Sequence, residues 1–146
     1  MKIRFLLLCA MALVIAPALH AQSNTNKQDI TGIWRCQMEG LPAVTLTVTN
    51  EEGSLTGAVL FYLHRREPGQ AVTATPGVPE PLFHPSFDGK TFTFDVSHRR
   101  AHPPQTMNDG PVTFQLKLDG PDKAELLNEN EHDPNAPVYI LTRTAY

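Results

Sequence analysis

The sequence predicts an all-β fold: an eight-stranded antiparallel up-and-down barrel preceded by a signal peptide. Beyond residue 28, hydrophobic and polar residues alternate with the period of two that is typical of half-buried strands. The 13 prolines are scattered and disfavour long helices, and no segment offers the crossover helix that parallel strands need. The 146 residues suffice for one hydrophobic core but not for two independent ones. A two-sheet sandwich is the alternative, although closure into a barrel removes exposed sheet edges.

Residues 1–21 have the pattern of a secretory signal peptide. Two basic residues precede an uncharged apolar run, a proline interrupts this run, and small residues follow it (MKIRFLLLCAMALVIAPALHA). We expect cleavage after Ala21, with cleavage after Ala18 or an uncleaved anchor as alternatives. The apolar run is too short to span a bilayer comfortably. The protein is therefore expected to be secreted or periplasmic, with no stable membrane insertion after cleavage.

The mature chain would keep one cysteine, Cys36, which excludes a disulfide within the chain. Cys36 lies two residues after Trp34 on the same face of a predicted strand, so we expect burial, with pairing between chains as the alternative. Cleavage removes two of the 12 basic residues and none of the 15 acidic ones, which changes the formal net charge from −3 to −5. Without an excess of basic residues, nucleic-acid binding has no support.

A flexible polar leader (22–28) is predicted to precede a single barrel domain over residues 29–146. Its eight strands are predicted at 33–38, 43–49, 55–65, 82–87, 90–98, 112–118, 123–127 and 138–143. Gly57 in the third strand predicts a bend or a bulge. Short turns are predicted at 50–54, 88–89 and 119–122, where Gly, Asn and Asp gather. Longer loops are predicted at 66–79, 99–111 and 128–137.

Two short motifs lie at the ends of this strand pattern: Gly32-Ile33-Trp34 opens the first strand and Leu141-Thr142-Arg143 ends the last. This arrangement resembles the lipocalins and fatty-acid-binding proteins (the calycins). The resemblance implies that Trp34 packs at the closed end of the barrel beneath Arg143, with Gly32 beside them, as a structural unit. The chain departs from those families because residues 39–42 are too few for a helical lid and no T-D-Y segment or C-terminal helix is present. The opening of the domain is also similar to small uncharacterised secreted bacterial proteins, which implies no function.

In an up-and-down barrel, the three long loops would share one rim, opposite Trp34. Basic and histidine side chains gather at this rim, and we assign them as candidate ligand-binding residues: His64, Arg65, Arg66, His98, Arg99, Arg100 and His102. The loop after the seventh strand adds Glu129, Glu131, His132 and Asp133. Three interpretations stay open. The arginines could bind a carboxylate or phosphate, the histidines and carboxylates could bind a metal, or the basic and acidic groups could simply pair with each other.

The sequence contains no G-x-S-x-G elbow, P-loop or H-E-x-x-H motif, so we assign no catalytic residue, cofactor or metal. We expect the barrel to bind a small hydrophobic or amphiphilic ligand, which can carry an anionic group at the long-loop rim. Phe and Leu side chains would line the interior, with Tyr62 or His64 at its mouth. The alternative is a non-catalytic module with a filled core that presents its loops to a protein partner. The free volume of the interior distinguishes the two.

Overall fold

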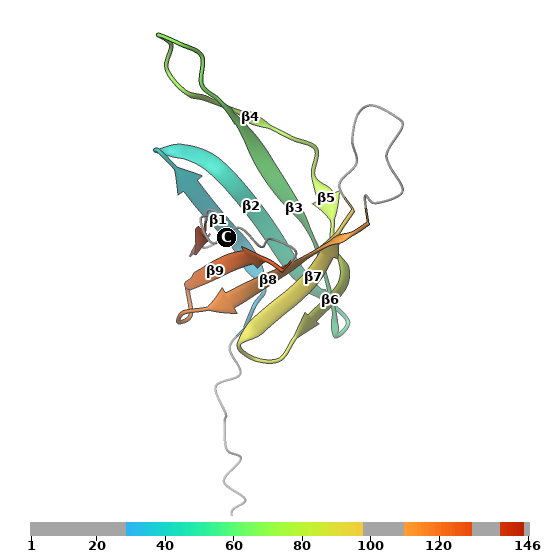
Figure 1. Cartoon of the computed structure of the whole chain (residues 1–146). Coiled ribbons are helices and arrows are strands. Elements are labelled where there is room, and N and C mark those ends of the chain that lie inside the picture. The colour runs from blue at the N-terminus through green and yellow to red at the C-terminus, as the bar shows by residue number, and fades with distance from the viewer. Residues whose placement is uncertain (1–28, 98–109, 130–137, 145–146) are drawn as a thin grey trace, which may run out of the picture.

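A computed structural model describes residues 29–97, 110–129 and 138–144. These residues form a curled antiparallel sheet without helices, which confirms the prediction of an all-β fold (Figure 1). Its ten strands are β1 (Gly32–Met38), β2 (Leu41–Glu51), β3 (Ser54–Arg65), β4 (Thr73–Pro76), β5 (Glu80–Pro81), β6 (Phe83–Phe87), β7 (Thr91–Val96), β8 (Val112–Leu118), β9 (Lys123–Asn128) and β10 (Tyr139–Thr144). The predicted signal peptide and leader lie outside the described residues.

Ten strands are described where the sequence predicts eight, and both additions come from the segment between β3 and β6. Residues 73–76 were expected to belong to a long loop, but they form β4 and pair with the end of β3. The prolines and glycines around this segment predict a loop, although its Thr-Ala-Thr sequence contains two β-branched residues that favour a strand. Pro76 ends β4, which lies at an edge of the sheet, where its missing N–H costs no ladder bond. Together β3 and β4 form an arm that extends beyond the rest of the sheet (Figure 1).

The strands follow the order β4-β3-β2-β1-β10-β9-β8-β7-β6, so most neighbours in the sheet are also neighbours in the sequence. The exception is the pairing of β1 with β10, which places Trp34 opposite Arg143. Residues 80–87 connect the two ends of this order. β5 pairs with β3, and one residue later β6 begins its pairing with β7.

Gly57 lies where residues 80–87 pack against β3. The Leu82 amide donates a hydrogen bond to the Gly57 carbonyl oxygen over 3.1 Å. A Cβ at residue 57 would collide with the backbone carbonyl of Thr47 and would lie 3.1 Å from Leu82 Cδ1. The pairing of β2 with β3 runs through Val48 and Gly57 without a register shift, so of the two predicted features, a bend or a bulge, the bulge is absent. The glycine instead leaves room for close packing of the backbone.

The concave side of the sheet forms a single hydrophobic core. Its fully buried side chains include Trp34, Leu46, Val48, Val59, Phe92, Phe94, Val96, Leu116, Leu126 and Leu141. Phe61 of β3 lies 5.5 Å from Phe114 of β8, and Phe94 lies 5.7 Å from the same ring (centroid distances). Since β3 and β8 are not neighbours in the sheet, these rings fill the interior between its opposite walls.

We expect Gly57→Ala to lower the free energy of unfolding by about 1–3 kcal/mol, because the new methyl group must displace a backbone carbonyl. Urea unfolding measures this change. Gly110→Ala is the matched control, since nothing lies within 4 Å of a Cβ built at that residue. Equal stabilities of the two variants would contradict the close approach at Gly57.

Candidate functional site

One end of the curled sheet is closed by Trp34 and Arg143. The indole of Trp34 is 0% exposed, and its Nε1 donates a hydrogen bond to the Ile30 carbonyl oxygen over 3.0 Å. The guanidinium carbon of Arg143 lies 4.6 Å from the centroid of this indole, which is a cation–π distance. A Cβ at Gly32 would lie 3.4 Å from Arg143 Cγ, so the glycine leaves space for the arginine.

Hydrogen bonds from Arg143 bring the chain preceding β1 and the β8–β9 turn to this closed end. Its guanidinium donates to the carbonyl oxygen of Asp29, and its backbone amide donates to the carbonyl oxygen of Asp122 over 2.9 Å. The Asp29 carboxylate accepts hydrogen bonds from the amide and hydroxyl of Thr31. The Thr31 amide is the main cause of a lowered Asp29 pKa; partial burial opposes it, and the Thr31 hydroxyl and the charge of Arg143 lower the pKa further. These contacts close this end of the apolar interior.

We expect Trp34→Ala to cost about 3–5 kcal/mol of stability, as a buried large-to-small change does. Because Trp34 is the chain's one tryptophan, its emission reports directly on this end. Arg143→Ala should shift the emission wavelength and lower the melting temperature, whereas the exposed Arg65→Ala should do neither. Unchanged emission and melting in the Arg143 variant would contradict a stabilising contact between the two residues.

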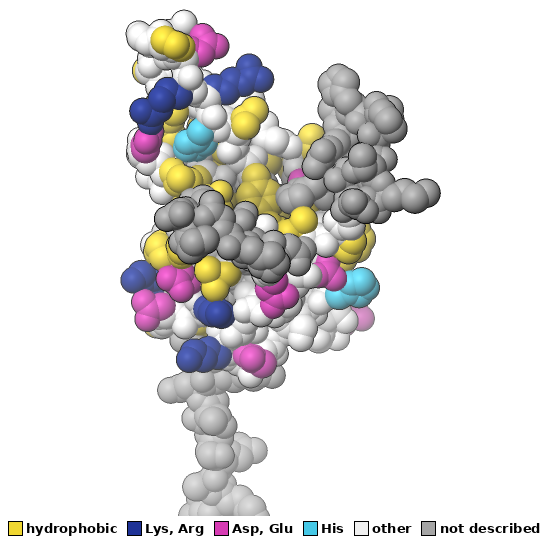
Figure 2. Space-filling model, in the orientation of Figure 1, with side chains coloured by type: hydrophobic (Ala, Val, Ile, Leu, Met, Phe, Trp, Pro, Cys, Tyr) yellow, Lys and Arg dark blue, Asp and Glu magenta, His cyan; other side chains and the backbone are white. Residues whose placement is uncertain are grey.

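The opposite end of the interior is lined by apolar side chains that stay partly exposed. Phe61, Val112 and Tyr139 are only partly buried, and Leu63 is 57% exposed. Strand alternation places Leu63 on the same side of β3 as Phe61. In Figure 2, hydrophobic side chains are visible in a hollow beneath the β3–β4 arm. This end therefore offers an accessible apolar surface continuous with the core.

Cys36 lies beneath this surface and is buried, as its position after Trp34 predicts. Burial raises the pKa of its thiol, and a hydrogen bond from the Ile140 backbone opposes the shift. The pKa of Tyr139 is also raised, first by burial and then by the charge that Cys36 would carry as a thiolate. Both groups are therefore held in their neutral forms in an apolar environment, which makes the thiol a poor nucleophile.

The structure describes three of the predicted rim residues, and two of them are bound to the start of β2 and to the β1–β2 turn. His64 Nε2 lies 2.7 Å from the Pro42 carbonyl oxygen, and Arg66 donates to both carboxylate oxygens of Glu39 over 2.7 Å. Arg65 is exposed, on the same side of β3 as Phe61 and Leu63. Other predicted residues lie outside the described part of the chain: His98, Arg99, Arg100, His102, Glu131, His132 and Asp133.

The expectation that Tyr62 or His64 stands at the mouth of the interior is wrong. The register pairs Phe61 with the buried Val44 and Val59 with the buried Leu46. Tyr62 and His64 are therefore on the outer face of β3. The third strand carries apolar residues on both faces, so its sequence alone does not show which face is buried.

A hydrogen-bonded group on the outer face of β6, β7 and β8 was not predicted from the sequence. His84 Nδ1 lies 3.0 Å from Asp95 Oδ2, and the Thr113 hydroxyl donates to Asp95 Oδ1 over 2.8 Å. His84 has φ = 48°, in the left-handed region, and its side chain is 87% exposed. The register shift between Phe83 and Ser86 brings it there. The hydrogen bond with His84, followed by that from Thr113, is the main cause of a lowered Asp95 pKa.

A carboxyl group whose pKa is lowered by folding stabilises the fold above its ordinary pKa of 3.8, and that contribution disappears as the pH falls through the lower value. We expect Asp95→Asn to reduce the loss of stability below pH 3.8, as measured by urea unfolding across the acid range. Thr113→Val should raise the Asp95 pKa measured by NMR titration, while Thr113→Ser keeps the hydroxyl and the low pKa. Parallel acid unfolding curves for the parent and Asp95→Asn would contradict this assignment.

Among the residues that the structure describes, no group of three or more His, Cys, Asp or Glu side chains could bind a metal ion. No helix in the described ranges has the length and hydrophobicity to cross a membrane. Comparison of the chain with known protein families, with curated proteins and with solved structures finds no match in any of the three.

Proposed function

We propose that the domain is an eight-stranded up-and-down barrel in which residues 80–87 act as one strand. The pairing of β5 with β3 and of β6 with β7 supports this closure, as does the bond from the Leu82 amide to Gly57. The contact of Trp34 with Arg143 is consistent with a resemblance to the lipocalin and fatty-acid-binding proteins. A signal peptide at residues 1–21 would place the mature protein outside the cytoplasm or in the periplasm.

The function we propose for this barrel is the binding of a small hydrophobic or amphiphilic ligand. The observation that carries the proposal is the difference between its two ends. Trp34 is 0% exposed at one end, whereas Leu63 is 57% exposed at the other, beside the partly buried Phe61 and Tyr139. Exposed apolar side chains that continue into a core are typical of ligand sites.

Arg65 makes an anionic amphiphile the best-fitting ligand. It is two residues beyond Leu63 and four beyond Phe61 on the same side of β3, or about 13 Å from Phe61 along an extended strand. A medium-chain carboxylate could place its tail against Phe61 and Tyr139 and its charged group against the Arg65 guanidinium. The arginines and histidines at 98–102 belong to the same proposed rim.

A protein-interaction or accessory module is the second candidate. Phe61, Phe94 and Phe114 meet across the interior, so the middle of the core is occupied by aromatic rings. A ligand would therefore have to bind above these rings. If it does not, the loops and the β3–β4 arm would serve a protein partner instead.

Calorimetric titration with dodecanoate and the neutral dodecanol separates the two candidates. We expect both to bind, with Leu63→Glu weakening both because it places a charge on the apolar surface. Arg65→Gln should weaken the binding of dodecanoate about tenfold and leave the affinity for dodecanol unchanged. Added salt should weaken only the dodecanoate complex, since an exposed ionic contact is screened.

Lys117→Gln is the control, because Lys117 is exposed on the outer face of β8, away from the proposed site. Absence of binding by the parent protein would favour the interaction module. Binding that neither Leu63→Glu nor Arg65→Gln alters would overturn the assignment of the ligand to this end.

A further inference from the structure

Three pockets formed by described residues involve outward-facing side chains, and the largest lies over β1, β2 and β3. Its volume is about 350 Å³, within the range of small-molecule sites. It is lined by the outward-facing Arg35, Gln37, Pro42, Thr45, Leu60 and Tyr62, and at its floor by the buried Cys36 and Val44. The pairings that turn Trp34, Leu46 and Val59 inward place Arg35, Thr45 and Leu60 on the opposite face. The pocket therefore opens on the face of the sheet opposite to the apolar end described above, with Cys36 and Val44 between them.

A shift in strand register lies at this pocket, on the convex face of the sheet. The pairing of β1 with β2 shifts register between Cys36 and Gln37, so that Gln37 lies opposite Pro42. Pro42 lacks the N–H that a regular ladder would use. Bulges of this kind redirect side chains and are common beside functional sites.

The register also sets the dimensions of the site. Arg35, Thr45 and Leu60 form one row across three adjacent strands, which spans about 10 Å. Gln37 and Tyr62 each lie two residues further along their strands, or about 7 Å from that row. The area is that of a single six-membered ring with its substituents, flanked by an aromatic side chain, an aliphatic side chain and three polar ones.

Arg35 is the residue that distinguishes this pocket from the others. Its cross-strand neighbours are Thr45 on β2 and Thr142 on β10, and no ion pair joins it to another residue in the described ranges. An exposed guanidinium between two neutral residues keeps its full capacity for a bidentate bond to a carboxylate.

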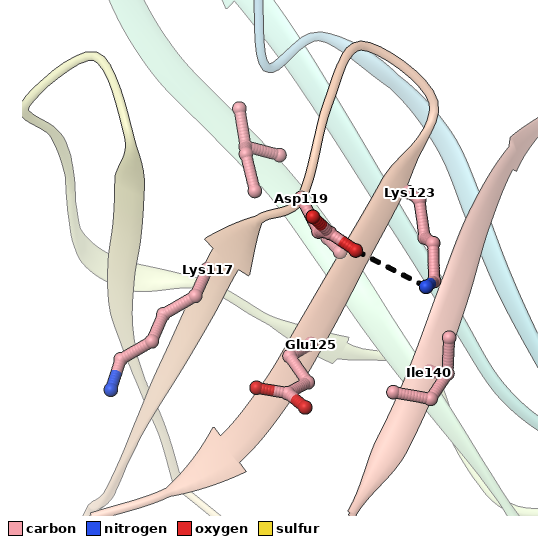
Figure 3. Close-up of a pocket in the computed structure, with 7 residues that line it drawn as sticks. Lys117, Asp119, Lys123, Glu125 and Ile140 are labelled. Atoms are coloured by element: carbon pink, nitrogen blue, oxygen red, sulfur yellow. Dashed lines mark hydrogen bonds and ion pairs between the residues drawn. The ribbon is translucent and has the colours of Figure 1, made fainter.

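The other two pockets contain cations with internal acidic neighbours. In the pocket of Figure 3, Lys123 lies 3.1 Å from Asp119, and Lys117 is opposite Glu125 in the pairing of β8 with β9. In the pocket beside Met38 and His64, Arg66 binds both carboxylate oxygens of Glu39. An anion would compete with these carboxylates, whereas at Arg35 it would not.

We propose that the outer pocket of β1, β2 and β3 binds a small ring-borne carboxylate. The carboxylate bonds to the Arg35 guanidinium, and the ring lies against Tyr62 and Leu60. Gln37 and Thr45 supply hydrogen bonds to ring substituents. The ring comes either from a sugar acid or from an aromatic acid, since both present an apolar face and a carboxylate.

Titrations of the ¹⁵N-labelled protein with glucuronate and with benzoate distinguish the two sources. We expect one of them to cause saturable amide shifts centred on Arg35, Thr45 and Tyr62. The neutral analogues, glucose and benzyl alcohol, should bind about tenfold more weakly because they cannot pair with the guanidinium. Shifts centred elsewhere, or none with either acid, would overturn the proposal.

Arg35→Gln should lower the affinity for the acid about tenfold and leave the affinity for its neutral analogue unchanged. Tyr62→Leu should weaken the binding of both the acid and the analogue. The NMR spectrum of each variant reports whether it is folded. Lys117→Gln is the matched control in the pocket of Figure 3 and should bind like the parent. Leu63→Glu, which disturbs the proposed amphiphile site on the inner face, should also bind like the parent, so that either proposal can fail alone. Equal affinity of the parent and Arg35→Gln for the acid would overturn the role of Arg35.

Discussion

The packing of Trp34 against Arg143 holds together the two ends of the described chain. The residues face each other in the pairing of β1 with β10, although more than a hundred residues separate them in sequence. Bringing together residues so far apart in the sequence costs loop-closure entropy, and the local turns between them do not offset this cost. The buried indole, its bond to the Ile30 carbonyl and the guanidinium above it supply interactions that offset this cost. Without them, β1 and β10 would each become an exposed edge.

Closure at this end determines what the rest of the molecule can do. Trp34 and Arg143 fill the space between the strands at this end, whereas apolar surface stays accessible at the opposite end, around Phe61 and Tyr139. Gly57 has a related role at the other seam of the sheet, where residues 80–87 pack against β3. A glycine lies at each seam: Gly32 leaves space for Arg143, and Gly57 lies close to the Thr47 carbonyl of β2 and to Leu82.

Much of the fold could be predicted from the sequence because inward and outward residues alternate clearly in most strands. The predicted bounds of residues 112–118 match β8, whose apolar residues alternate without exception. The third strand was harder, because apolar residues occupy both of its faces and only pairing with Val44 and Leu46 shows which face is buried. β4 could not be recognised because its stability depends on pairing with the end of β3 rather than on its own composition.

The candidate sites were less predictable than the strands because they depend on register shifts. His84 reaches Asp95 through the irregular pairing of β6 with β7. The prolines of residues 82–87 favour an irregular or edge strand, but they do not indicate which side chain the irregularity redirects. The outer pocket likewise lies at a register shift, between Cys36 and Gln37 of β1. Charge clusters could be located from the sequence, but the choice of partner could not: Arg66 binds Glu39 of the β1–β2 turn, whereas the sequence suggested the acidic loop that begins at Glu129.

The two proposed sites use arginines on opposite faces of the sheet. Alternation places Arg65 on the inner side of β3, with Leu63, and Arg35 on the outer side of β1, with Thr45. A slip of one residue in the pairing would exchange the faces of an entire strand. Burial of Leu46 and Val59 opposes such a slip, since exposing each of these side chains costs about 1.5–3 kcal/mol. The same packing that excludes water from the core therefore fixes which cation faces the interior and which faces the outer pocket.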